Sequence, residues 1–519
     1  MALALLPIVV VIVATFDQWH LFRATSDQAL IELQIRDVGT RAVLVGPYSR
    51  FGWYHPGPAL FYLFAVPYRL LGSSLIAVPL TALALNAACV VSIGWLARRR
   101  GGLVLMALLL LGTVLLIGAL GGSALRDVWN PTVTVLPLVV LVLVVWSAVE
   151  GDGWALPVAV GLGSFLVQAH VGYAGAVGVL LVWALVGTVV RSRRTVGSLT
   201  PTLVAAAVVG AVMWVLPAVD QFTHHPGNLG LVLQFGRDPE VPVHGLADGW
   251  HVVARALSWR MPWATGATAF NAFVGEVALS GPAAFPAGLL ALGGAGIVAG
   301  VRRQWRAVRL DVTVGLTLVA ATISFGRLTG PMFPYLVVWV WGPAMLAWIG
   351  AAWSLWCAVA PPARARAARV CIPVLVGLLG VAAVVVAADA ASVEVVRPDQ
   401  VAATRIFSKA ARAAAADGRG AVLVDAFGEP RARSIGVGVA LELERHGIPV
   451  EVPLDQGVAY GVDRTHDGGR LRARLTIAPP GLVAATPGSE SWELLARARL
   501  ASERDGDDTA ALGIYRLPR

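Results

Sequence analysis

The sequence is poor in charge and almost free of lysine. Charged residues make up 14% of 519 residues, and Lys409 is the single lysine. A Walker A loop requires a Gly-Lys-Ser/Thr triplet, so this chain cannot carry an ATPase site of that kind. The three cysteines, Cys89, Cys357 and Cys371, lie in or beside apolar runs and have no partner at metal-ligand spacing. A disulfide framework and a structural zinc site are therefore not expected.

Apolar residues are abundant instead, at 57% of the chain with a mean hydropathy of +0.73. A membrane-spanning helix needs roughly 20 apolar residues, and runs of that length recur up to residue 389. The sequence predicts a polytopic α-helical membrane protein with about eleven transmembrane helices. No clear signal-peptide cleavage site follows the first run, so we expect the first span to be retained. The predicted spans are 1–20, 74–97, 102–121, 131–149, 154–170, 172–190, 199–218, 282–301, 309–326, 333–357 and 370–389.

Arginine clusters just past the apolar runs indicate how the chain crosses the membrane. Loops rich in Lys and Arg stay in the cytoplasm. The N-terminus is then cytoplasmic, the loops 23–73, 122–130 and 219–281 face outward, and the protein is a multi-pass protein of the plasma membrane. The net charge of +9 is explained by topology and by contact with membrane lipids, so nucleic acid is not an expected partner. The clusters are Arg98–Arg100, Arg191/Arg193/Arg194, Arg302/Arg303/Arg306 and Arg364/Arg366/Arg369.

Residues 56–72 are apolar but do not fit this count of spans. The segment is short, contains Pro67 and ends on the amphipathic pair Tyr68-Arg69. We interpret it as a helix lying in the outer interface. The alternative is an ordinary span, which would make the next arginine cluster an exception to the charge rule.

The chain divides into a membrane domain, residues 1–389, and a polar domain, residues 390–519. The polar part predicts a small extracytoplasmic α/β domain. Its expected elements are helices over 399–417 and 434–447 and strands at 421–427, 450–453, 475–478 and 513–517.

Two outward-facing acids are the candidate catalytic residues. Asp27 opens a helical stretch, 26–38, just after the first span. Helical spacing turns Glu32 about 140° away from it, so the two do not share a face. Asp27 is equally explained as a first-turn acid favoured by the helix dipole. Asp127 lies in the short second loop beside Arg126, at membrane depth, where ionisable groups are costly and often functional.

Other outward-facing polar residues are candidates for substrate binding. Asn130 with Pro131 also reads as an ordinary helix start. His170 in a tight turn is equally compatible with a structural role, and an arginine such as Arg327 could either fork a phosphate or anchor a headgroup. No metal site is predicted, although a divalent cation is left open as a cofactor. The candidate substrate-binding residues are Glu32, His55, Arg126, Asn130, His170 and Arg327.

Together these features resemble the GT-C membrane glycosyltransferases, in particular lipid A aminoarabinose transferases and protein O-mannosyltransferases of actinobacterial type. The resemblance rests on the early Asp27, the His-Pro-Gly-Pro start at His55, the span ending in Ala-Arg-Arg-Arg, the acidic second loop and the external C-terminal domain. It covers mainly residues 1–175. Gln28 departs from the pattern, because many relatives carry a second acid there, which puts a metal site of adjacent carboxylates in doubt.

The resemblance implies a glycosyltransferase that uses a polyprenyl-phosphate sugar donor on the outer face of the membrane. The acceptor would be a glycan, lipid or protein of the cell envelope, in cell-wall biogenesis for example. It implies that Asp27 is the first-loop catalytic acid and Asp127 the second-loop carboxylate. Two other functions stay open, a flippase or transporter of lipid-linked sugars and a non-catalytic protein of envelope assembly. The first predicts functional polar groups at mid-membrane, and the second predicts that Asp27 is dispensable.

Overall fold

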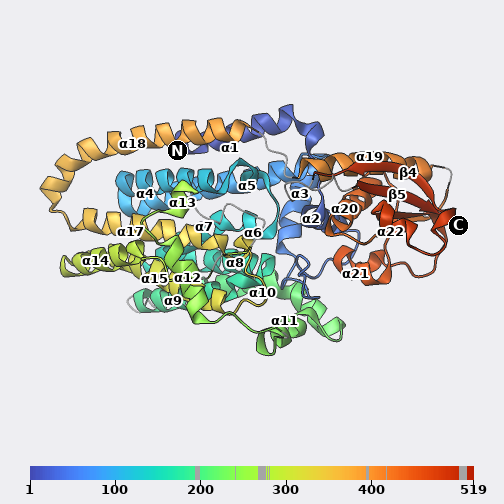
Figure 1. Cartoon of the computed structure of the whole chain (residues 1–519). Helices are drawn as coiled ribbons and strands as arrows, with labels where there is room; N and C mark the ends of the chain where they lie inside the picture. The colour runs from blue at the N-terminus through green and yellow to red at the C-terminus, as the bar shows by residue number, and fades with distance from the viewer. Residues whose placement is uncertain are drawn as a thin grey trace.

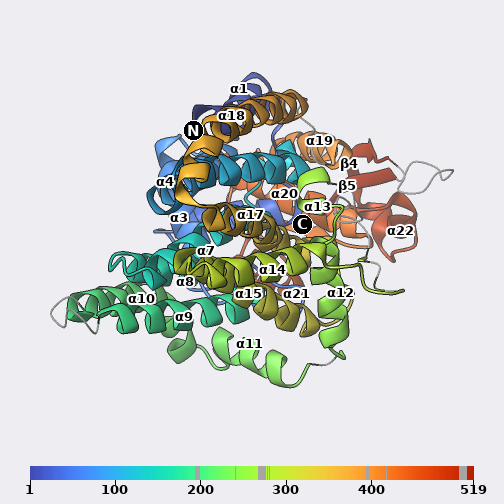
Figure 2. The same ribbon diagram turned by 90° about the vertical axis from the view of Figure 1, so that its left-hand side faces the viewer.

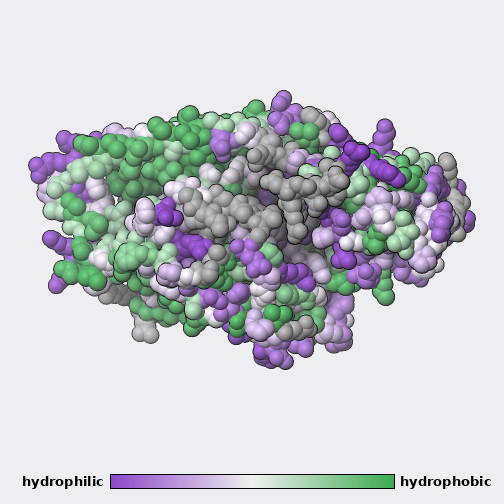
Figure 3. Space-filling model, viewed as in Figure 1, coloured by the Kyte–Doolittle hydropathy of each residue, from purple (hydrophilic) through white to green (hydrophobic). Residues whose placement is uncertain are grey.

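The structure is a computed structural model of two parts, a bundle of long helices and a small α/β domain at one end of it (Figure 1). On the face shown in Figure 3, apolar side chains gather over the upper part of the bundle and the end away from the α/β domain, whereas polar side chains are more frequent on the α/β domain. The structure describes residues 1–192, 199–239, 241–266, 276–277, 279, 281–392, 397–416, 418–501 and 511–518.

The bundle confirms the predicted polytopic α-helical fold. Among the described residues, seven helical segments are long and apolar enough to cross a membrane, and four shorter apolar helices accompany them. The long segments are α4 (Ala77–Leu120), α6–α7 (Asn130–Val133, Val135–Val149), α9 (Ala174–Ser192), α10 (Leu199–Thr223), α15 (Trp305–Gly326), α16–α17 (Pro334–Val337, Trp341–Ala358) and α18 (Pro361–Ala391). The short ones are α1 (Ala2–Asp17), α3 (Ala59–Leu70), α8 (Ala155–Ala169) and α14 (Ala287–Val301).

Helix α4 is a hairpin of two helices, as the two predicted spans 74–97 and 102–121 require. Gly102 has a φ of 75° and breaks the helix, a conformation that glycine adopts without steric cost. A Cβ atom added at Gly94 would lie 3.2 Å from Leu110. The two residues would be about 24 Å apart on one straight helix, so the chain reverses between them.

One end of the bundle collects arginines. The side chain of Arg100 donates to Ser147 Oγ at 3.2 Å and pairs with Asp152. Arg306 donates to the carbonyl of Arg100 at 3.1 Å, and its Nε lies 3.5 Å from Glu150. Basic loops from different parts of the sequence therefore meet at this end. Of the predicted clusters, Arg193 and Arg194 lie outside the described residues.

The opposite end carries α2 (Ser26–Asp37), which the sequence predicts over 26–38, and α3. The backbone N–H of Ala59, at the start of α3, donates to Oε1 of Gln168 at the end of α8, at 3.2 Å. Near the other end of α3, Tyr68 donates to Glu32 of α2 at 2.7 Å. Both ends of α3 therefore lie at the same end of the bundle, so the helix does not run through it.

The long segment after α10 forms short helices rather than an open loop. They are α11 (Asn228–Arg237), α12 (Leu246–Ala256) and α13 (Pro262–Thr265). Residues 267–275 of the predicted loop 219–281 lie outside the described part of the chain. Helix α5 (Gly122–Arg126) fills most of the other short loop, 122–130.

The C-terminal domain is built on a mixed sheet in the order β2-β1-β3-β5-β4. Strands β1 (Ala421–Ala426), β2 (Val450–Glu451) and β3 (Leu471–Ala478) are parallel, and β5 (Ala511–Leu517) runs antiparallel to β3 and to β4 (Glu493–Arg499). Strand β4 was not among the predicted strands. The helices are α19 (Pro398–Ala414), α20 (Pro430–Arg445), α21 (Leu454–Tyr460) and α22 (Pro480–Ala484).

Buried ion pairs join this domain to α2. Arg464 is 1% exposed and makes hydrogen bonds of 2.7 and 2.8 Å to the carboxylate of Asp37. It also donates to Glu444 of α20 at 2.7 Å. Arg445 pairs in the same way with Glu32. The helix that carries Asp27 is therefore clamped along its other side by the C-terminal domain, and the view along the bundle shows this domain behind the helices (Figure 2).

Candidate functional site

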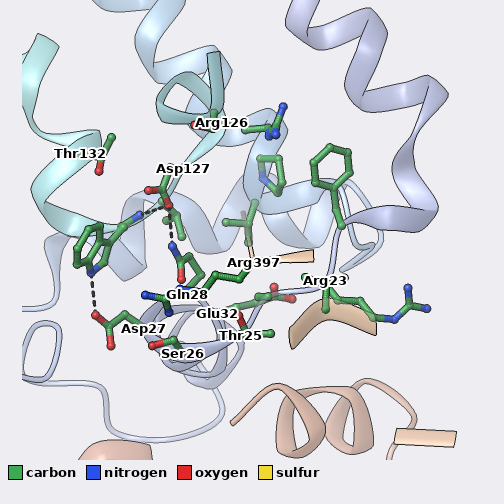
Figure 4. Close-up of a pocket in the computed structure, with 18 of the residues that line it drawn as sticks. Arg23, Thr25, Ser26, Asp27, Gln28, Glu32, Arg126, Asp127, Thr132 and Arg397 are labelled. Atoms are coloured by element: carbon green, nitrogen blue, oxygen red, sulfur yellow. Dashed lines mark hydrogen bonds between the residues drawn. The ribbon is translucent and has the colours of Figure 1, made fainter. Parts of the chain in front are cut away.

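The two candidate acids, Asp27 and Asp127, meet at one indole. Asp27 opens α2, while Asp127 lies in the connection between α5 and α6. Trp129 Nε1 donates to Asp27 Oδ2 at 2.9 Å, and the backbone N–H of the same Trp129 donates to Asp127 Oδ1 at 2.9 Å. Gln28 Nε2 lies 3.4 Å from Asp127 Oδ1 (Figure 4). The side chain and the backbone of Trp129 thus hold the two acids in a fixed relation.

The chain before Asp27 is in an unusual conformation. Ser26 has a φ of 51°, a left-handed value that residues other than glycine seldom adopt. Such conformations cluster at functional sites. The helix starts at this residue, so the side chain of Asp27 projects from the first turn of α2 into open space rather than into the core.

The protonation equilibria of both acids are shifted upward. Burial raises the pKa of Asp127 to about 6, although hydrogen bonds from Trp129 and Gln28 oppose the shift. Desolvation also raises the pKa of Asp27, against the hydrogen bond from Trp129 and the positive charge of Arg397. Asp27 is open to the cavities described next, yet protein surrounds it on most sides. A carboxylate with a raised pKa and a fixed partner in a cavity is a candidate general base.

Asp27 lies where two cavities meet. The first has a volume of about 240 Å³ and lies between the end of α1, the start of α2 and the α5–α6 connection. Its charged lining is drawn in Figure 4. It is lined by Arg23, Asp27, Glu32, Arg126, Asp127 and Arg397, among others.

The second cavity, on the far side of Trp129, is larger and cationic. It has a volume of about 460 Å³, and Asp27 is the one acid in its described lining. Arg50 stands over the rings of Phe51 and Phe333 at 4.9 and 5.0 Å. Arg327 donates to the carbonyl of Gly236 at 2.5 Å. With two arginines against one acid, this cavity favours an anion.

His55 and His170 line the second cavity as a stacked pair, with ring centroids 4.7 Å apart. Nδ1 of His55 accepts from the amide of Val171 at 3.2 Å, and Nδ1 of His170 accepts from Gly172 at 3.1 Å. Burial lowers the pKa of His55 well below its usual value and that of His170 to about 4, so both rings are neutral at pH 7. A neutral ring whose Nδ1 accepts carries its proton on Nε2. Each histidine therefore offers one fixed N–H donor.

A close approach of the backbone sets His55 in place. A Cβ atom at Gly46 would come within 2.6 to 2.8 Å of the carbonyl oxygens of Gly57, Gln168 and His55. Only glycine allows the segment before α3 to pack this closely on the end of α8. The position of His55 therefore depends on a residue that the sequence does not mark as functional.

Three of the other candidates have partners within the protein. Glu32 lines the first cavity, but its Oε1 atom accepts from Tyr68 at 2.7 Å and from Arg445 at 3.0 Å. Asn130 lines the second cavity and donates to the carbonyl of Ala169 at 2.9 Å. It does not cap the following helix as predicted, because the helix cap is Trp129. Arg126 is buried, 4.9 Å above the ring of Phe22, beside Asp127.

Sequence reasoning missed four residues of this site. Trp129 was not among the candidates, and Gln28 stood out only as the position where relatives carry an acid, yet both donate to the candidate acids. Tyr335 packs on Trp129 with ring centroids 4.7 Å apart. Arg397 comes from the start of α19, far away in the sequence. An arginine directly before a proline-started helix was a weak signal for the last of these, because cations are unfavourable at helix N-termini.

Metal-ligand types also gather outside the site. Within the described residues, the group of three whose ligand atoms lie within 4.8 Å of one another is Glu451, His466 and Asp467, in the C-terminal domain. Glu451 already accepts a hydrogen bond from His466 at 2.5 Å. Asp27 and Asp127 could offer two carboxylates to a cation, but both already accept hydrogen bonds from Trp129.

Neither protein-family models nor curated protein sequences gave a match. Solved structures gave matches over nearly the whole chain. ArnT from Cupriavidus metallidurans, in a crystal structure bound to undecaprenyl phosphate, is similar with a TM-score of 0.57 and 12% identity. The alignment covers 99% of this chain and 97% of that one.

The apo structure of the same ArnT gives a TM-score of 0.53 at 13% identity, covering 95% of this chain and 94% of that one. ArnT is the lipid A aminoarabinose transferase, a GT-C enzyme. The likeness extends through the C-terminal domain, beyond the residues 1–175 on which the sequence resemblance mainly rested. The chain has the fold of ArnT, and the predicted resemblance to the GT-C membrane glycosyltransferases is confirmed at the level of the fold.

Proposed function

We propose that this protein is a membrane glycosyltransferase that moves a sugar from a polyprenyl-phosphate donor to an acceptor of the cell envelope. The observation that carries the proposal is the place of Asp27, a desolvated carboxylate where the first cavity, of mixed charge, meets the cationic second cavity. Transfer between two substrates needs such a junction, with a base at the point where the substrates meet. The ArnT fold supports this function.

The second cavity suits the donor phosphate. Arg50 and Arg327 can fork a phosphate, and the Nε2–H groups of His55 and His170 add neutral donors. The cavity reaches Ile323 of α15 at the flank of the bundle, where apolar side chains are exposed. A prenyl tail would lie along that flank with its phosphate inside. Support for a lipid phosphate also comes from the ArnT structure that binds undecaprenyl phosphate.

The first cavity is left for the acceptor. In the proposed reaction the acceptor hydroxyl oxygen attacks the anomeric carbon, and its proton passes to the carboxylate of Asp27. The bond from that carbon to the phosphate oxygen breaks, and polyprenyl phosphate leaves with the electron pair. Arg50, Arg327 and the two histidines would stabilise the charge that develops on it. Asp127 would position the acceptor.

We further propose that the Asp27 end of the bundle faces outward and the arginine end faces the cytoplasm. The charges of the arginine end support this orientation. The C-terminal domain would then be extracytoplasmic, residues 390–519, and the membrane domain would span residues 1–389. A lipid-linked donor is confined to the membrane surface, so a site at bundle-end level would meet its phosphate directly.

The test is the substitution Asp27→Asn, assayed with radiolabelled polyprenyl-phosphate sugars in membranes with matched protein levels. A lost general base lowers the rate about 10²- to 10⁴-fold, whereas a helix-start effect would cost about 1 kcal/mol of stability and leave turnover intact. Asp17→Asn, an exposed acid at the end of α1, is the matched control and should transfer normally. Wild-type transfer by Asp27→Asn would rule out the assignment and favour a flippase or an assembly protein.

A further inference from the structure

The C-terminal domain places one arginine in the first cavity. Arg397 precedes α19 and lines this cavity together with Asp27 and Asp127. Figure 4 shows its side chain reaching over the first turn of α2, where Asp27 and Gln28 lie. Its charge acts on the carboxylate of Asp27. No hydrogen bond or close ion pair to another described residue holds its guanidinium elsewhere.

The position of Arg397 is unfavourable by local criteria. Its φ of 56° and ψ of 61° are left-handed, a conformation that costs energy for any residue with a Cβ atom. It also stands at the N-terminus of α19, where the helix dipole disfavours a cation. Neither feature stabilises the fold, so the reason for an arginine here lies in what its side chain reaches.

The helix that follows Arg397 is anchored in the C-terminal domain. Gln400, in the first turn of α19, accepts from Ser434 of α20 at 2.7 Å, and Phe407 is fully buried in the core of the domain. Helix α20 is in turn joined to α2 by the ion pair of Arg445 with Glu32. Asp27, on α2, and Arg397, before α19, are thus carried by elements that these contacts join to one another.

We propose that Arg397 is a positioning residue for Asp27. The guanidinium of Arg397 supplies the positive charge that keeps the carboxylate of Asp27 ionised and directed into the first cavity. The C-terminal domain is then part of the reaction site rather than an appendage. The inference rests on the proposed function, because it takes Asp27 to be the general base. A base must be unprotonated at working pH to accept a proton, and a nearby cation offsets the desolvation of a carboxylate that protein surrounds on most sides.

Other charged and titratable groups face Asp27, so the role of Arg397 has to be separated from theirs. On α2 itself, Glu32 is neutralised by Arg445. The remaining groups line the two cavities on the other elements. They are Arg126 and Asp127 in the α5–α6 connection, Tyr48, Arg50 and His55 before α3, His170 after α8, Arg327 and Tyr335 on the α15–α16 side, and Arg23 before α2. Tyr54, also before α3, lines a third and much smaller cavity together with Asp27.

The experiment measures the protonation of Asp27 directly, without any sugar. N,N′-dicyclohexylcarbodiimide modifies carboxyl groups in their protonated form, and mass spectrometry of the purified full chain gives the labelled fraction of Asp27 at each pH. In Arg397→Ala the pH at half-labelling should rise by up to about 1 unit, because the variant loses a positive charge that favours the ionised carboxylate. Arg397→Lys should return it towards the wild-type value.

Two controls accompany it. Arg419→Ala removes an exposed arginine of the same domain and should leave the labelling curve unchanged. Asp27→Asn should abolish the labelled peptide. Binding of undecaprenyl phosphate to each variant, measured in parallel, reports on the second cavity and should be unaffected by Arg397→Ala. In the transfer assay, kcat of Arg397→Ala should fall most at low pH while KM for the donor stays constant.

The outcomes separate the two proposals. A labelling curve of Arg397→Ala that superimposes on wild type overturns the role of Arg397, whatever the activity. A shifted curve in a protein that neither binds undecaprenyl phosphate nor consumes a polyprenyl-phosphate sugar supports the positioning of Asp27 and overturns the glycosyltransferase. A misfolded Arg397→Ala protein would be recognised by its melting curve, and Arg397→Gln, with a polar side chain of similar length, then decides by the same labelling measurement.

Discussion

Asp27 and Asp127 share a tryptophan but differ in what surrounds them. Asp27 is open to two cavities and faces the cation of Arg397. Asp127 has backbone and amide donors on one oxygen and a pKa of about 6. Two acids with different environments can take different roles in one reaction. Both acids could be picked out as candidates from the sequence, but their surroundings could not. Trp129, Gln28 and Arg397 come close to Asp27 and Asp127 only when the chain folds.

The raised pKa of Asp127 predicts a pH-dependent gain in stability for Asp127→Asn. The folded protein binds this proton more tightly than the unfolded chain, so ionisation costs folding free energy. The loss in folding free energy from ionising Asp127 is absent below a pH of about 4 and grows up to a pH of about 6. Above that pH it is constant, at no more than about 3 kcal/mol. Asn avoids it. The variant should therefore melt higher than wild type at pH 7.5 in detergent and equally at pH 4, with reduced transfer. Equal melting at pH 7.5 would contradict the shift.

Helix α2 is the element on which the site depends. One side carries Asp27, and the other carries Glu32 and Asp37 into ion pairs with Arg445 and Arg464. Its limits followed from the sequence, since a polar start and a regular apolar spacing are local properties. Strand β4 was missed because the same local properties were misleading there. Its sequence ELLARAR favours a helix by propensity, and only pairing with β5 makes it a strand.

Breaking the clamp should loosen the C-terminal domain. Arg464→Met removes the guanidinium that joins Asp37 to Glu444 and leaves Asp37 with the longer, 3.5 Å pair to Arg41. Removing one partner of a buried ion pair typically costs about 3–5 kcal/mol. We expect a lower melting temperature and faster proteolytic release of residues after α18, with transfer lost together with docking. Arg419→Ala is again the matched control. A variant that stays as resistant to protease as wild type would show that apolar contacts alone hold the domain.

At the scale of the whole molecule, charge distribution allowed the fold to be predicted well. Apolar runs predict the spans, and arginine clusters predict where the spans end. Both patterns reflect the membrane rather than tertiary contacts. The pairing of helices and the cavities were beyond prediction. They depend on contacts such as that of His55 with Val171 or of Arg464 with Asp37, which no local pattern encodes.

Orientation can be tested with single cysteines in a chain whose three native cysteines are replaced by alanine. Arg302→Cys lies at the arginine end and Ser491→Cys on the C-terminal domain, and both positions are exposed. A membrane-impermeant maleimide should label position 491 in intact cells and position 302 only after the membrane is opened. The reverse pattern would put the site on the cytoplasmic side and exclude a donor presented outside.

The clamp between α2 and the C-terminal domain also fixes when the protein becomes competent during its synthesis. Asp37 and Arg464 are 427 positions apart, and Arg397 reaches Asp27 from a comparable distance along the chain. When every span has been synthesised, Arg397 and Arg464 have not yet been translated. If the proposed site is right, the nascent chain would therefore stay inactive until its last segment has folded onto the first, and a chain truncated before α19 would be a bundle without a finished site.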